Sequence, residues 1–140
     1  MDNLDMNHDV KKPAIYVLSE SHSMADPLQQ RPGLRQHVWR PPTDVFETED
    51  TIVVRVEAAG MLEADFSVVL DGRFLSIRGV RSDVIERRAY YQMEIPFGEF
   101  ASEVELPFPV EAQRIEAIYK NGFLRVTLPK AHPQKVDIEV

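Results

Sequence analysis

Four histidines are the residues best suited to acid–base chemistry or metal binding in this chain of 140 residues. They are His8, His22, His37 and His132, which all lie near one end of the chain or the other, and no two have the i, i+4 spacing of a helical metal site. A Ser-His-Asp site needs a histidine that is held rigidly, which a flexible chain end does not supply. We therefore expect solvated histidines, with no metal site and no catalytic residue.

Carboxylates are numerous, but their pattern does not indicate catalysis. The chain has 23 Asp and Glu residues, and the group Glu47, Glu49 and Asp50 is typical of a solvated turn. A glycosidase pair stays open at this point, because the separation of two carboxylates is a three-dimensional quantity. The sequence contains no cysteine and no Gly-rich phosphate-binding motif. We expect a protein that is not an enzyme and needs no cofactor.

The overall charge bears on the partners of the protein. The formal net charge is −7, since 16 Lys and Arg stand against 23 Asp and Glu. Such a surface is a poor partner for nucleic acid or an anionic membrane, because affinity for these comes largely from neutralising phosphate. Asp2, Asp5 and Asp9 stand where a signal peptide carries positive charge, and the apolar run 14–18 is too short to span a bilayer. We expect a soluble cytoplasmic protein without a nucleic acid or membrane partner.

From Trp39 onward, apolar residues alternate with polar ones. This period of two predicts half-buried strands, and no stretch shows ten residues of helical periodicity. The expected strands cover residues 52–56, 66–70, 75–77, 104–106, 115–119 and 124–128. Their number and spacing predict an all-β fold, a β-sandwich over residues 39–130. Trp39 itself is expected to pack on the end of this sandwich.

Two glycine-containing turns predict hairpins. Asp71-Gly72 is a strong two-residue turn signal, and Asn121-Gly122 is another. With Asn121 and Gly122 at the centre of a type I′ turn, the flanking strands pair so that their apolar residues share one face. The predicted cross-strand pairs are Tyr119 with Leu124, Ala117 with Val126, and Ile115 with Leu128.

Residues 1–38 are predicted to be a flexible N-terminal arm. Most of this segment is polar, but Ile15, Tyr16, Val17 and Leu18 belong to a short apolar patch. The patch is either part of a disordered terminus or a segment that binds the apolar surfaces of client proteins.

Two further segments have strand patterns without an obvious partner. Residues 80–99 form a connection too long for a hairpin, yet residues 89–95 alternate like a strand. In the tail, residues 131–140, Val136, Ile138 and Val140 alternate with acidic residues. Both segments are typical of strands that add to the edge of another sheet.

Five motifs in order and at consistent spacing resemble those of the small heat-shock protein (α-crystallin) family. The similarity covers about residues 39–130 and the tail, and the most diagnostic motif is Ala117-x-x-x-Asn121-Gly122-x-Leu124. The other segments that carry the resemblance are Pro42 to Glu47, Ala59-Gly60-Met61 with Asp65-Phe66, Leu75-Ser76-Ile77-Arg78-Gly79 with Arg81, and Gly98-x-Phe100 to Leu106-Pro107.

The resemblance implies an immunoglobulin-like β-sandwich, the α-crystallin domain, with a flexible N-terminal arm and a short C-terminal tail. It implies a homodimer formed by strand exchange through the long loop, and a higher homo-oligomer formed by a tail anchor that fills an apolar groove. The implied activity is that of an ATP-independent holdase, which binds unfolding client proteins and prevents their aggregation. Residue by residue, the exchange loop contains Arg88, Tyr90, Tyr91 and Met93, the anchor is Ile138 and Val140, and the groove for tail or client is lined by Val68, Leu70, Ile115, Ala117 and Tyr119.

The chain departs from the family pattern at the dimer interface and at the tail. Ile95 follows Glu94 where the family often has Arg, and Ser102 stands where an interface Arg is usual, so the ion pairs across the dimer must differ. The chain ends at Val140, which leaves Val136 and Ile138 as an alternative anchor, and Ile138 and Val140 could instead frame a last strand of their own sheet. Two other functions stay open: a monomeric co-chaperone adaptor with a related sandwich, and a structural protein of a stress-coated surface or spore.

Overall fold

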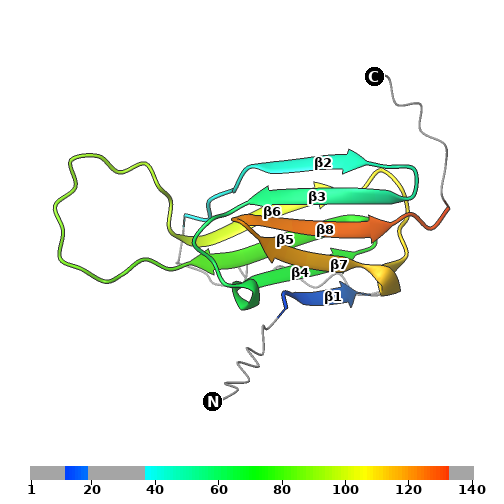
Figure 1. Ribbon diagram of the computed structural model, residues 1–140, viewed down its shortest axis with the longest axis horizontal. Coiled ribbons are helices and arrows are strands. Elements are labelled where there is room, and N and C mark those ends of the chain that lie inside the picture. Colours follow the sequence, from blue (N-terminus) through cyan, green and yellow to red (C-terminus); the bar gives the residue numbers. More distant parts are fainter. Residues whose placement is uncertain (1–11, 19–36, 133–140) are drawn as a thin grey trace, which may run out of the picture.

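The computed structural model describes residues 12–18 and 37–132, which form two four-stranded β-sheets packed face to face (Figure 1). One sheet contains β1 (Ala14–Leu18), β4 (Phe66–Asp71), β5 (Phe74–Arg81) and β6 (Gly98–Glu105) in that order, and the other contains β2 (Thr43–Glu47), β3 (Thr51–Glu57), β8 (Phe123–Pro129) and β7 (Glu116–Lys120). The helices of the described residues are two short 3-10 turns, η1 (Glu63–Asp65) and η2 (Ala112–Arg114). The predicted all-β sandwich is confirmed.

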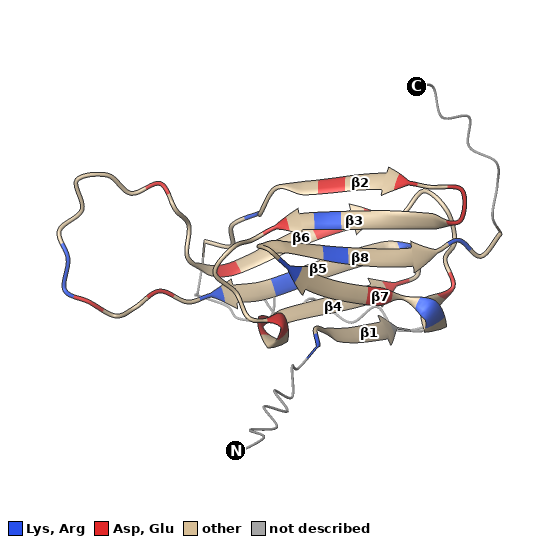
Figure 2. Cartoon of the chain, in the orientation of Figure 1, with Lys and Arg blue, Asp and Glu red and all other residues tan. Residues whose placement is uncertain are grey.

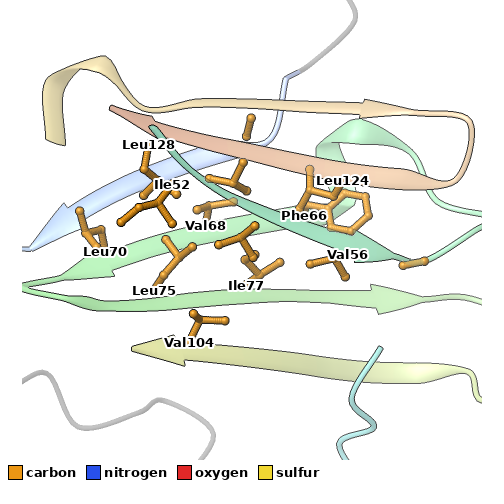
Figure 3. Close-up of a cluster of buried hydrophobic side chains, with 14 of the residues drawn as sticks. Ile52, Val56, Phe66, Val68, Leu70, Leu75, Ile77, Val104, Leu124 and Leu128 are labelled. Atoms are coloured by element: carbon orange, nitrogen blue, oxygen red, sulfur yellow. The ribbon is translucent and has the colours of Figure 1, made fainter. Parts of the chain in front are cut away.

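The core lies between the two sheets and is built from the inward-facing residues of each strand. Alternate side chains of β3, β4, β5 and β8 are almost completely buried, as the period-two pattern requires. Figure 3 shows these side chains meeting between the sheets. The buried core includes Ile52, Val54, Val56, Phe66, Val68, Leu70, Leu75, Ile77, Leu124, Val126 and Leu128.

The β7–β8 hairpin has the predicted register. Tyr119 pairs with Leu124 and Ala117 with Val126, while Ile115 lies just before β7 and packs against the core. Asn121 has φ +53° and Gly122 has φ +81°, so both central residues are in the left-handed region that a type I′ turn requires.

The β4–β5 hairpin turns one residue later than predicted. Asp71 pairs with Phe74, so the two central residues are Gly72 and Arg73 rather than Asp71 and Gly72. Gly72 has φ +61°, which places the glycine at the first central position, as in a type II′ turn. The other turn would pair Val68 rather than Leu70 with Leu75 and would keep the same side chains on the inner face, so burial does not choose between the two. The backbone does, because a type I′ turn at Asp71-Gly72 needs a positive φ at Asp71, whereas the observed turn needs it only at Gly72.

Trp39 packs on the end of the sandwich as predicted. Its ring lies 5.1 Å from that of Phe100, and its indole nitrogen donates a hydrogen bond of 3.2 Å to the Gly98 carbonyl. Phe100 in turn packs against Gly79, where a Cβ atom would come within 2.5 Å of the Phe100 ring. A side chain at position 79 would therefore displace the ring that supports Trp39.

One segment that was predicted to belong to the flexible arm, residues 14–18, is a strand of the sandwich. Residues Ala14–Leu18 form β1, which pairs with β4 in parallel, whereas every other strand pair of the described residues is antiparallel. The segment lacks a hairpin partner next to it in the sequence, so its local pattern could not show where it binds. Within the described residues, no helix has the length and apolar character needed to cross a membrane.

Candidate functional site

The five residues predicted to line a groove lie in one apolar cluster between β4 and β7. Val68 and Leu70 of β4 and Ala117 of β7 belong to the buried core. Ile115 and Tyr119 are partly buried and pack against it. Tyr119 is fixed further by its hydroxyl, which donates a hydrogen bond of 2.7 Å to the Ala58 carbonyl. The structure thus brings together all five predicted positions.

β1 occupies the β4 edge of this cluster. Ile15 lies opposite Val68, and Val17 lies opposite Leu70. Ile15 packs against the core, whereas the side chain of Val17 is 48% exposed. Tyr16 is exposed on the opposite face. The predicted groove therefore has an occupant from the same chain, and the predicted client-binding patch is that occupant.

The long loop between β5 and β6 projects away from the sandwich (Figure 1). Within one chain, residues 82–97 form no strand, and the side chains of Tyr90, Tyr91 and Met93 are exposed. Ile85 and Ile95 are also exposed. An apolar segment of this kind is unfavourable in water, and it is typical of a surface that another molecule covers.

Arg88 folds the first half of this loop onto itself. Its guanidinium donates hydrogen bonds to the Asp83 carboxylate at 2.8 Å, to the Glu86 carboxylate at 3.2 Å and to the Tyr90 hydroxyl at 2.9 Å. The hydrogen bond from Arg88 holds the pKa of Asp83 below its usual value, and the same bond raises the pKa of Arg88. Because these groups are close to water, salt screens their attraction.

Arg81 holds the base of the loop. Its guanidinium donates to the Pro96 carbonyl from two nitrogens, at 2.5 and 3.0 Å, and to the Ala59 carbonyl at 3.3 Å. The same group lies over the rings of Trp39, at 4.4 Å, and Phe97, at 5.3 Å. These contacts join the two ends of the loop, so the loop leaves the sandwich at a fixed place.

The second sheet has a strand with one free edge, β2. Among the described residues β2 pairs with β3 alone, and Val45 and Phe46 are partly exposed there. The two sheets are joined next to this edge by a hydrogen bond of 2.7 Å between the hydroxyls of Thr43 in β2 and Ser102 in β6. Ser102 is completely buried, so the position where the family usually has an interface Arg joins the sheets within one subunit here.

The outer face of the β1-β4-β5-β6 sheet contains an open hollow with a volume of about 970 Å³. Its lining includes the apolar side chains of Tyr16, Val69, Phe74 and Val80, of which Tyr16, Phe74 and Val80 are exposed. Sequence reasoning missed this hollow, because strand residues that face away from the core are expected to be polar. Apolar residues at 69, 74 and 80, out of phase with the buried set, were the available signal.

Charged residues of both signs are interspersed over the sheets and the long loop (Figure 2). Several form cross-strand ion pairs at the surface, among them Arg55 with Asp44 at 2.6 Å and Arg78 with Glu103 at 3.1 Å. Such exposed pairs contribute little stability, typically up to about 1 kcal/mol each.

Lys130 is a buried cation that sequence reasoning also missed. Its ammonium lies 2.7 Å from the Glu47 carboxylate and 5.4 Å from the centre of the Phe108 ring. Its backbone nitrogen donates to the Asp50 carbonyl at 2.8 Å, so the residue joins the end of β8 to the β2–β3 turn. Glu47, which the sequence assigned to a solvated turn, is a partner in this ion pair.

Some residues for which the sequence predicted a role or an environment lie outside the described part of the chain. These are the tail anchor, Ile138 and Val140, and the histidines His8 and His22. His37 and His132 are exposed. The described residues contain no group of three or more His, Cys, Asp or Glu side chains that could hold a metal ion.

Comparison with known proteins gives a consistent result. Residues 44–140 match the profile of the Hsp20/alpha crystallin family. A probable 15 kDa heat shock protein from Leptospira interrogans is 33% identical over 125 residues, which cover 89% of this chain and 95% of the relative. Heat shock protein 16 from Schizosaccharomyces pombe is 34% identical over 107 residues, which cover 71% of this chain and 73% of that protein.

Solved structures agree with these relatives. Heat shock protein 16.0 from Schizosaccharomyces pombe superposes with a TM-score of 0.65 at 32% identity, over 72% of this chain and 96% of that one. A small heat-shock protein from Xylella fastidiosa, whose structure is described as a distinct high order structure, gives a TM-score of 0.59 at 26% identity, over 73% and 98% of the two chains.

Proposed function

Because the chain belongs to the Hsp20/alpha crystallin family, we propose that it is an ATP-independent holdase, which binds unfolding proteins in the cytoplasm and prevents their aggregation. Heat shock proteins are prominent among its relatives. A holdase needs exposed apolar surface that matches what an unfolding protein exposes, and it needs no nucleotide site.

The observation that carries this proposal is the apolar hollow on the outer face of the β1-β4-β5-β6 sheet. Phe74 and Tyr16 keep more than half of their surface exposed there, although a strand face in contact with water is usually polar. Apolar segments of an unfolding client that bind there would bury both their own surface and that of the hollow. Each Å² of apolar surface removed from water would stabilise the complex by about 25 cal/mol.

Assembly is the second part of the proposal. The exposed loop residues Arg88, Tyr90, Tyr91 and Met93 would pair with the free edge of β2 in a second copy, and in this way form a homodimer. The unpaired edge and the partly exposed Val45 support this arrangement, because unpaired strand edges bind other strands readily.

Larger assemblies would form through the tail, with Ile138 and Val140 as the anchor and with Val136 and Ile138 as the alternative pair. The high order structure of the Xylella relative supports an oligomer. When several weak strand contacts join the same assembly, each contact raises the effective concentration of the partners of the others. A short anchor is then sufficient to hold the oligomer together.

The test is suppression of the aggregation of an unrelated, heat-labile enzyme such as citrate synthase, followed by light scattering without ATP. We expect suppression near a 1:1 ratio of subunits to enzyme, and weaker suppression by Phe74→Ser, which removes apolar surface from the hollow. Phe123→Ser is the matched control, because Phe123 is exposed on the other sheet. If a tenfold excess of the intact protein leaves aggregation unchanged, the holdase proposal is wrong.

A further inference from the structure

The apolar hollow on the outer face of the β1-β4-β5-β6 sheet lies beside a line of glutamates on β6. Residues that are paired across neighbouring strands point to the same face of a sheet. One row of paired residues across this face is Tyr16, Val69, Ser76 and Glu103, and another is Asp71, Phe74 and Glu105. Each row ends on a glutamate of β6, so apolar and acidic side chains share one face.

Carboxylates outnumber cations around this hollow. Glu99 and Glu103 of β6 line it together with Asp65 and Asp71, and Glu105 stands at its rim, opposite Phe74. The basic residues of the same hollow and rim are two arginines, Arg78 and Arg73. The hollow therefore carries an excess of negative charge.

The two arginines do not use up the carboxylates they contact. Arg78 lies 3.1 Å from Glu103, and Arg73 lies 3.5 Å from Glu105. The side chains of these two glutamates are still 68% and 60% exposed. A carboxylate has about four lone-pair sites, so each can accept further hydrogen bonds from an ammonium or a guanidinium group of a bound molecule.

The outer face of the β2-β3-β8-β7 sheet is balanced by comparison, and Figure 2 shows charges of both signs on its strands. Apolar side chains are exposed on this face as well, namely Ile118 and Phe123. The charged residues that point outward from its described strands are Arg55, Lys120 and Arg125, with Asp44, Glu57 and Glu116. The acidic character of the hollow is thus a local property, beyond the net charge of the chain.

One short segment of a bound protein can contact the apolar and the acidic groups together. Phe74 and Glu105 are paired on neighbouring strands, which lie about 4.8 Å apart in a sheet. Consecutive Cα atoms of a bound chain are about 3.8 Å apart. A residue that packs on Phe74 therefore brings its neighbours close to Glu105, and the long side chains of Lys and Arg extend this reach.

We propose that the hollow selects, among unfolding segments, those in which Lys or Arg lies next to large apolar residues. The apolar side chains of such a segment pack on Tyr16, Val69 and Phe74, while its cations pair with Glu103 and Glu105. An acidic segment with the same apolar residues is repelled. This inference deepens the proposed function and rests on it, because it names the class of client that the holdase binds.

The probes are two short peptides that carry the same fluorescent label and the same Leu and Phe residues. One peptide has Lys and the other has Glu at every charged position. Their affinities for the full-length protein are measured by fluorescence anisotropy. We expect the Lys peptide to bind at least about tenfold more tightly in dilute buffer. The difference should shrink in about 1 M salt, which screens exposed charges.

Two matched double variants separate the hollow from the net charge of the chain. Glu103→Gln/Glu105→Gln removes two carboxylates at the hollow and should lower the preference for the Lys peptide severalfold. Glu57→Gln/Glu116→Gln changes the net charge by the same amount on the outer face of the other sheet, and it should leave the preference unchanged. Phe74→Ser should weaken both peptides by a similar factor, because it removes apolar surface and no charge.

Equal affinity for the two peptides would overturn the proposal, and so would the absence of binding of either peptide to the intact protein. An equal loss of preference in the two double variants would overturn it as well, because the attraction would then come from the charge of the whole chain. The readout is a ratio of peptide affinities, which does not depend on the aggregation assay. A protein that shows this preference without suppressing aggregation would contradict the holdase proposal alone.

Discussion

Leu124 has no exposed surface and lies between Val56 of β3 and Tyr119 of β7. Leu124→Ala should lower the free energy of unfolding by about 2–5 kcal/mol, because it removes buried methyl groups and leaves a cavity. Urea unfolding measures this change. Ile118→Ala, at a neighbouring but exposed position, should cost less than about 1 kcal/mol. A change below about 0.5 kcal/mol for Leu124→Ala would mean that Leu124 is not a core residue.

Arg88 and Asp83 form an ion pair within the first half of the long loop, so this pair should affect how readily that half opens. Hydrogen bonding to Arg88 lowers the pKa of Asp83 from its ordinary value of 3.8. A carboxylate with a lowered pKa stabilises the folded loop while it is ionised. The contribution is therefore present at neutral pH and is lost as the pH falls below 3.8 and through the lowered value.

Asp83→Asn removes this charge at neutral pH. We expect it to speed cleavage by trypsin after Arg87 and Arg88 by about twofold to fivefold, as for the loss of an exposed ion pair. Glu94→Gln is the control, because Glu94 lies in the same loop and hydrogen-bonds Gln92 rather than Arg88. The difference should shrink in about 1 M salt, which screens exposed charges. Equal cleavage rates at low salt would show that the ion pair does not order the loop.

At the scale of strands, the features that could be predicted are those that depend on residues close together in the sequence. The alternation of apolar residues locates the core strands, and Asn121-Gly122 fixes the register of β7 and β8, because turn type and burial require the same pairing. The turn after β4 was predicted one residue early, because Asp71-Gly72 and Gly72-Arg73 both fit a two-residue turn, and they differ in which residue must adopt a positive φ.

Features that depend on distant contacts could not be predicted in the same way. β1 pairs with a strand some 50 residues later in the sequence, and Lys130 meets Glu47 only after β8 has joined its sheet. The apolar cluster of the candidate groove was predictable from its residues, since all five face the core, but its occupant was not.

For the whole molecule, the molar mass measured by light scattering distinguishes a monomer, a dimer and a larger assembly. We expect a large assembly for the intact chain, and dimers both for the chain truncated after Lys135 and for the full-length variant Ile138→Gly/Val140→Gly. The reason is that the tail would join dimers and the long loop would form them. A monomer in every form would contradict strand exchange and would favour the monomeric adaptor. An unchanged assembly after truncation would contradict the tail anchor.

Trp39 is the only tryptophan of the chain, and it lies against Phe100 with the Arg81 guanidinium over its ring. Its intrinsic fluorescence therefore comes from one place, the base of the long loop beside β6. That place is on the opposite edge of the sheet from β1. Emission wavelength and quenching should thus follow loop docking without any added label, and they should not respond to a change confined to β1. The protein therefore carries its own optical probe for the base of the long loop.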